Sequence, residues 1–220
     1  MAQSRTSSLT ILWLIVAVVF IWSLIHPKEY FTWSLEVFPA IIAAIVLLVT
    51  RKRFRLTTLV YVLIAVHMVI LMVGGHYTYA EVPLGNWVRD YFGLSRNHYD
   101  RLGHLAQGFV PAMVAREVLI RLSVVRGRGW LFVLVTSVCL AISALYELLE
   151  WTVSVLTGSA GDAFLGTQGD VFDTQKDMAM ALCGAILAQL LLSPYHDGQI
   201  RRMGIEGGRG ECATRRRGEE

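Results

Sequence analysis

Long apolar segments alternate with short polar segments along most of the chain. The apolar segments lie at about 9–26, 34–50, 57–75, 104–121, 130–154 and 177–193. A hydrocarbon core of about 30 Å is crossed by a helix of roughly 17–25 apolar residues, so each segment is long enough to span a bilayer. The pattern predicts an all-α, polytopic membrane bundle of about six transmembrane helices.

The two ends of the chain interrupt this pattern in different ways. Arg5 precedes the first apolar segment, but the sequence Ile25-His26-Pro27-Lys28 after it lacks a small-residue cleavage site. We therefore interpret the segment as a retained helix. Residues 194–220 are rich in Gly, Arg and Glu and have little apolar surface to offset chain ordering. We expect a transmembrane domain over 1–193 and a disordered tail over 194–220.

Basic residues predict which side each connection faces. They gather in alternate connections and in the tail, namely Arg5, Arg51, Lys52, Arg53, Arg55, Arg121, Arg126, Arg128, Arg201, Arg202, Arg209 and Arg215 to Arg217. The other connections carry few. Since cytoplasmic loops retain positive charge, both termini are expected in the cytoplasm.

Composition supports membrane insertion. Hydrophobic residues make up 55% of the chain and charged residues only 17%, whereas soluble domains carry about 25% charged residues. The net charge of +3 arises from short basic segments that set topology. The expected partner is therefore the lipid bilayer, and nucleic acid is not expected.

The first chemically unusual stretch leads into the segment at 104–121. Asp100 and His104 are four residues apart and would share one face of a helix. Asp100 has a simpler role open to it, since a carboxylate in a first turn caps free amide groups. A buried histidine needs partners and serves as a metal ligand or a proton carrier.

The second stretch is the end of the segment at 130–154. Glu147 and Glu150 lie three residues apart beside Trp151. Ionisable residues within a membrane segment are costly and usually face a partner or a wet cavity. Glu150 has an alternative as a solvated residue at the interface, where tryptophan is common.

The third stretch leads into the segment at 177–193. Asp173 and Asp177 are again four residues apart, so a cation or a shared proton is expected between them, although a helix cap would explain one of the two. Gln168 and Asp170 precede them.

All three stretches fall on the side opposite the basic connections, which predicts one acidic pocket at the outer face. Carboxylate and imidazole ligands together suit a divalent cation such as Mg²⁺, Mn²⁺ or Zn²⁺. The candidate metal ligands are Asp100, His104, Glu147, Glu150, Asp173 and Asp177, and the candidate catalytic residues are His104, Arg101 and Glu147. The candidate substrate-binding residues are His76, Tyr79, His98, Gln168 and Asp170. The aromatic stretch 86–92 is expected at the outer interface, as a lid or as an ordinary anchor.

Several of these runs resemble a known family. His76-Tyr77-Thr78-Tyr79-Ala80, Arg96-Asn97-His98-Tyr99-Asp100-Arg101, Ser143-Ala144-Leu145-Tyr146-Glu147 and Phe164-Leu165-Gly166-Thr167-Gln168-Gly169-Asp170 are similar to the DUF2238 membrane proteins. The resemblance implies a bacterial inner-membrane location and little about mechanism. A weaker resemblance to VanZ-like membrane proteins rests on Asp100, His104, Glu147 and Asp177 with Gly184, and departs from that family in having Arg101 where Lys is expected.

These observations lead to one main functional hypothesis. The last three helices would form a cation-binding site that acts on a lipid head group or lipid-linked phosphate. A proton- or cation-coupled small transporter and a non-catalytic lipid-binding or assembly protein are the alternatives.

Overall fold

The computed structural model describes residues 2–158, 164 and 166–204, and these residues contain helices and no strand. The helices are α1 (Ala2–Leu24), α2 (Tyr30–Thr50), α3 (Thr58–Tyr77), the short 3-10 helix η1 (Tyr79–Glu81), α4 (Pro83–Phe92), α5 (Tyr99–Arg121), α6 (Arg128–Thr157) and α8 (Asp173–Arg202). By length and composition, α2, α3, α6 and α8 are able to cross a membrane, and α1 contains a shorter apolar stretch, Leu9–Leu24. The predicted all-α, polytopic membrane bundle is confirmed.

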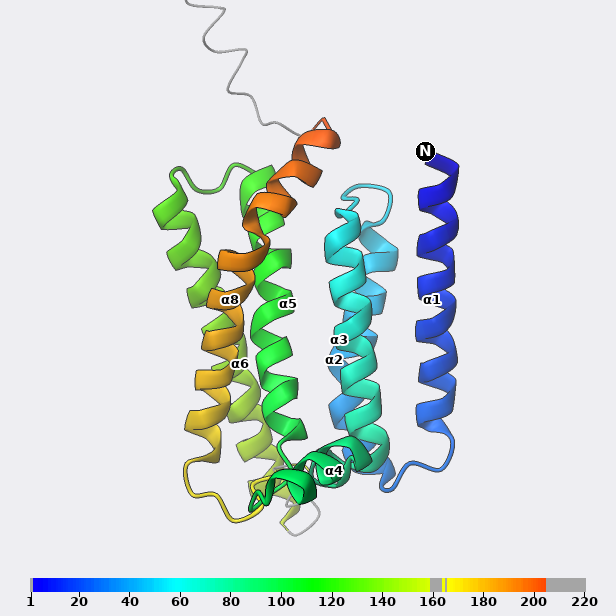
Figure 1. Cartoon of the computed structure of the whole chain (residues 1–220), viewed down its shortest axis with the longest axis vertical. Helices are drawn as coiled ribbons and strands as arrows, with labels where there is room; N and C mark the ends of the chain where they lie inside the picture. The colour runs from blue at the N-terminus through cyan, green and yellow to red at the C-terminus, as the bar shows by residue number, and fades with distance from the viewer. Residues whose placement is uncertain (1, 159–163, 165, 205–220) are drawn as a thin grey trace, which may run out of the picture.

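The long helices run side by side in two groups (Figure 1). Helices α5, α6 and α8 pack against one another, whereas α1 and α2 each pack on α3. The contact between α3 and α5 joins the two groups. Helix α4 lies across one end of the bundle, which we term the α4 end; the opposite end, with the N-terminus and the end of α8, is the tail end (Figure 1).

Helix α4 begins at Pro83, a residue that suits the first turn because its missing amide hydrogen has no helical acceptor. It ends at Gly93, whose φ of +62° is the left-handed conformation that favours glycine. Trp87, Tyr91 and Phe92 are exposed on it, and the Trp87 and Tyr91 rings stack with centroids 5.8 Å apart. An amphipathic helix of this kind suits the membrane interface.

Helices α5 and α8, which carry two of the polar stretches, begin earlier than hydropathy suggested. Helix α5 starts at Tyr99 rather than near 104, and α8 starts at Asp173 rather than near 177. Helix α8 also continues through Pro194 to Arg202, beyond the expected end at 193. The remainder of the expected tail, residues 205–220, lies outside the described residues.

Helices α5 and α8 approach so closely that their backbones touch. A Cβ at Gly108 would lie 1.8 Å from the Ala181 carbonyl oxygen, and one at Gly184 would lie 2.1 Å from the Leu105 carbonyl oxygen. Small residues permit this approach between membrane helices, where close van der Waals packing drives association. The pair therefore forms the centre of the α5–α6–α8 group.

We expect Gly108→Val to destabilise the bundle by about 1–3 kcal/mol, because the added side chain would push α8 away from α5. The measurement is thermal unfolding of the purified protein in detergent. Gly198→Ala is the matched control, since a Cβ at Gly198 on α8 meets nothing within 4 Å. Equal unfolding temperatures for the two variants would contradict the close contact.

Candidate functional site

Three distant stretches of sequence meet at the α4 end in a buried network of ion pairs. Arg96, which precedes α5, and Arg101 in its first turns each place a guanidinium nitrogen 2.5 Å from Asp173 Oδ1. Arg101 also pairs with Asp177. Each of these four residues is at most 8% exposed. The network holds the start of α5 against the start of α8.

The spacing of residues on the two helices explains this arrangement. Asp173 and Asp177 are one turn apart on α8, so both carboxylates face α5 and would repel each other. A cation or shared proton was expected between them, and the guanidinium of Arg101 occupies that place. Asp173 is thereby held by two arginines, which leaves it poorly placed as a metal ligand.

His104 lies one helical turn beyond Arg101 and is surrounded by acceptors. Its Nε2 is 3.5 Å from Asp100 Oδ1 and 3.9 Å from Asp177 Oδ1. Its Nδ1 is 3.1 Å from Gln107 Oε1 and 3.6 Å from Glu147 Oε1. The residue is 5% exposed. Each ring nitrogen of His104 thus has side-chain oxygen atoms close to it.

Three of these residues have the geometry of a metal site. Ligand atoms of Asp100, His104 and Asp177 all lie within 4.8 Å of one another. A cation with metal–ligand distances of about 2.0–2.5 Å has ligands roughly 3–5 Å apart, so the set fits a small divalent ion. Glu147 Oε1 is buried without a hydrogen-bond partner among the described residues, which leaves one further acceptor at the cluster.

Two other carboxylates lie close by. Glu150 is 7% exposed on α6, and Glu36 is 4% exposed on α2, where its Oε2 lies 3.4 Å from the Tyr146 hydroxyl that donates to it. Sequence reasoning missed Glu36 because none of the three polar stretches that it singled out lies in the segment at 34–50. A carboxylate within so apolar a helix was itself the signal.

The expected substrate-binding residues occupy several different places. Tyr79 is buried, with its ring 5.6 Å from that of Tyr99. His76 instead packs against α1: its ring lies 4.3 Å from that of Trp22, and its Nδ1 is 3.1 Å from the Ser23 carbonyl oxygen. His98 is exposed beside the cluster, where partial burial and the neighbouring Arg96 lower its pKa.

Gln168 and Asp170 fasten the loop that precedes α8. Gln168 and Asn97 form two hydrogen bonds: the Asn97 amide donates to Gln168 Oε1, and Gln168 Nε2 donates to the Asn97 carbonyl. Asp170 accepts from Lys176 at 2.6 Å, a contact that lowers the pKa of the Asp170 carboxyl, and lies 3.3 Å from Arg101. Both residues therefore close the loop over the ion cluster.

Asn97 connects this loop to the start of helix α4. Its side-chain amide donates to the Val82 carbonyl and to Asn86 Oδ1, and its Oδ1 accepts from the Tyr99 amide. A Cβ at Gly85 would lie 1.9 Å from Asn97 Oδ1, so the start of α4 is pressed against this side chain. The described part of the α6–α8 connection and helix α4 thus form one lid-like layer.

Comparison with known proteins places this architecture in a family. The family model described as "Predicted membrane protein (DUF2238)" matches residues 8–198. The chain belongs to the DUF2238 family. It is 50% identical over 201 residues to the inner membrane protein YjdF of Escherichia coli strain K12, covering 91% of this chain and 94% of that protein. No solved structure matches the chain. The relative and the apolar helices together support a multi-pass inner-membrane location.

This DUF2238 protein has a second buried polar cluster, at the tail end. Glu117 on α5 accepts from the amide and hydroxyl of Thr57, lies 3.0 Å from His196 Nε2, and pairs with Arg121 at 2.8 Å. Arg116 contacts Asp197 at 2.6 Å. The helix was expected to stop at 193, so sequence reasoning missed His196 and Asp197.

We expect Asp173→Asn to cost about 3–5 kcal/mol of stability in this DUF2238 protein, because two buried guanidinium groups would lose their shared anion. Thermal unfolding in detergent provides the measurement. Lys176→Gln is the control: the Lys176 side chain is 54% exposed, so its pair with Asp170 is worth less than about 1 kcal/mol. A loss for Asp173→Asn no larger than for the control would argue against a structural role for the arginine pairs.

Proposed function

We propose that this protein binds a divalent cation at the outer face of the inner membrane and acts there on the phosphate of a lipid head group or lipid-linked phosphate. One observation carries the proposal: the buried ring of His104 lies among Asp100, Glu147 and Asp177 at one end of the bundle. Hydrolysis or transfer of the phosphate ester is the reaction class that suits such a site.

The orientation follows from the ends of the helices. Arg51 follows α2, Arg121 ends α5, Arg128 begins α6, and Arg201 and Arg202 end α8, all at the tail end (Figure 1). The positive-inside rule assigns this end, with both termini, to the cytoplasm. The α4 end, with the ion cluster, then faces outward.

The roles of the cluster residues follow from the two sides of the His104 ring. Gln107 Oε1 accepts a hydrogen bond from a protonated Nδ1, which directs Nε2 toward Asp100 and Asp177 as the ligand atom. A bound cation would lower the pKa of a water molecule and neutralise a phosphate oxygen. Glu147, whose Oε1 has no hydrogen-bond partner among the described residues, is the proposed proton acceptor.

In this proposal the main role of Arg101 is structural, and phosphate binding is secondary. Its charge is balanced by Asp173 and Asp177, so its first role is to keep these two carboxylates together beside His104. Only its longer contact, 3.3 Å to Asp170, lies on the more exposed side of the network. A lipid phosphate would reach Arg101 there by displacing Asp170.

Metal titration of the purified protein in lipid nanodiscs tests the proposal. We expect wild-type protein to bind Mn²⁺ or Zn²⁺, and His104→Ala to bind at least about tenfold more weakly, because the nitrogen ligand is removed. His98→Ala is the matched control, since this exposed imidazole lies at the same end outside the ligand set. Absence of metal binding by the wild type would overturn the cation site.

Phosphate release from the same nanodiscs, containing phosphatidic acid or a polyprenyl phosphate, tests the reaction. Release that depends on added metal and is lost in His104→Ala is the expected result. Metal binding without any release would instead support a non-catalytic lipid-binding protein.

A further inference from the structure

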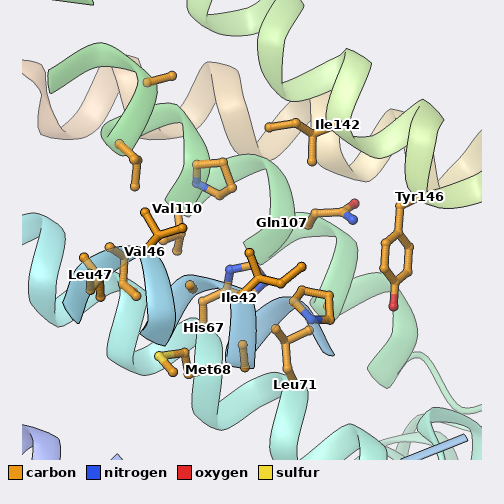
Figure 2. Close-up of a pocket in the computed structure, with 18 of the residues that line it drawn as sticks. Ile42, Val46, Leu47, His67, Met68, Leu71, Gln107, Val110, Ile142 and Tyr146 are labelled. Atoms are coloured by element: carbon orange, nitrogen blue, oxygen red, sulfur yellow. The ribbon is translucent and has the colours of Figure 1, made fainter. Parts of the chain in front are cut away.

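A deep groove leads from the ion cluster into the apolar part of the bundle. Its volume is about 740 Å³. Figure 2 shows side chains converging on it from α2 (Ile42 and Val46), α3 (Met68), α5 (Val110) and α6 (Ile142). Below the polar end its lining is aliphatic and aromatic apart from His67 and the hydroxyl of Thr50.

The groove extends along most of the membrane-spanning length of the bundle. On α2 its lining runs from Glu36 to Thr50, and along α5 it runs from Asp100 to Leu122, the residue that follows the helix. At 1.5 Å per residue these distances are about 21 Å and 33 Å. One leaflet contributes only about half of a hydrocarbon core of about 30 Å. The groove therefore crosses the bilayer midplane.

The groove is bordered by two helices that do not pack closely together. Helix α2 packs on α3, and α6 packs on α5 and α8, but α2 and α6 have no extensive contact. Along the groove Ile42, Val46, Val138 and Ile142 remain 40–51% exposed. Since water does not fill an apolar space of this kind, a hydrocarbon chain from the bilayer is its natural occupant.

The α4 end of the groove is acidic. Glu36, Asp100 and Glu150 line it together with His104, and the Tyr146–Glu36 hydrogen bond joins α6 to α2 there. A bare phosphate would be repelled by these carboxylates, whereas a phosphate bound through a divalent cation would not. An ion-conducting path is disfavoured because the lining between Gln107 and the tail end is largely apolar.

We infer that the groove holds the chain of a single-chain lipid phosphate, with the chain long enough to pass the midplane and the phosphate at the His104 cluster. A polyprenyl monophosphate has this chemistry. The inference rests on the proposed function for the head group and adds the substrate class. The inference depends on the depth of the groove, because a lipid chain confined to one leaflet would leave the half of the groove near Thr50 and Leu122 empty.

Native mass spectrometry of the full-length protein in detergent tests whether binding depends on the length of the lipid chain. The probes are a long-chain polyprenyl monophosphate, farnesyl monophosphate and dioleoyl phosphatidic acid, each with Mn²⁺. We expect the long-chain probe to bind about tenfold more tightly than the other two, because more of its chain packs against the groove. Equal binding of the long and short probes would overturn the inference, as would preferential binding of phosphatidic acid.

Blocking variants locate the chain. Ala115 lies in the tail-end half of the groove and Ala43 lies near its middle, closer to the ion cluster than Ala115, and both are only partly buried. Ala115→Trp is expected to abolish the preference for the long chain while farnesyl monophosphate still binds, and Ala43→Trp to weaken both probes. Ala141→Trp, on an exposed part of α6 outside the groove, is the control. Long-chain binding unchanged in Ala115→Trp at a normal unfolding temperature would overturn the inference.

A polyprenol, which lacks the phosphate, separates this inference from the proposed function. Binding of the polyprenol that is lost in Ala115→Trp supports the groove even where metal titration fails. If the wild-type protein binds metal but binds long and short chains equally, the proposed cation site is supported and the proposed role of the groove is contradicted.

Discussion

The guanidinium of Arg101 is the charge on which the α4 end of the bundle depends. Asp173 and Asp177 lie one turn apart on α8, in surroundings with little water to screen their repulsion. Arg101 from α5 contacts both, and Arg96 adds a second positive charge to Asp173. Once these contacts align α5 with α8, His104 is carried into the space bounded by Asp100, Asp177 and Glu147.

The same two helices are joined along their whole length by different means. Buried ions hold them at the α4 end, glycine contacts hold them in the middle, and the Glu117–His196 cluster holds them at the tail end. Helices α3 and α6 pack against α5, whereas α2 packs on α3. The apolar groove exists because this firmly joined pair, with α3, leaves α2 and α6 apart at the membrane-facing side.

Hydropathy was sufficient to predict the helical bundle, and the grouping of polar residues by side predicted which stretches would meet. They did not reveal that Arg101 would occupy the place where a cation or a shared proton was expected between Asp173 and Asp177. Hydropathy treats a charged residue as solvated whether or not it is paired. The predicted starts of α5 and α8 were therefore too late, and the predicted end of α8 came before His196. His76 was expected near the site because it lies at the end of α3, but it packs against Trp22 of α1. The position of a residue at a helix end does not determine which neighbouring helix its side chain contacts.

The backbone contact at Gly108 and Gly184 also determines the precision of the ion cluster. Because main-chain atoms touch there, the spacing of α5 and α8 is set without any adjustable side chain between them. This spacing also fixes the separation of Arg101 and Asp173, which lie about two turns from Gly108 and about three turns from Gly184, respectively. Substitution of Gly184 is thus expected to displace the buried charges from a distance, so these glycines support the ion cluster as much as its arginines do.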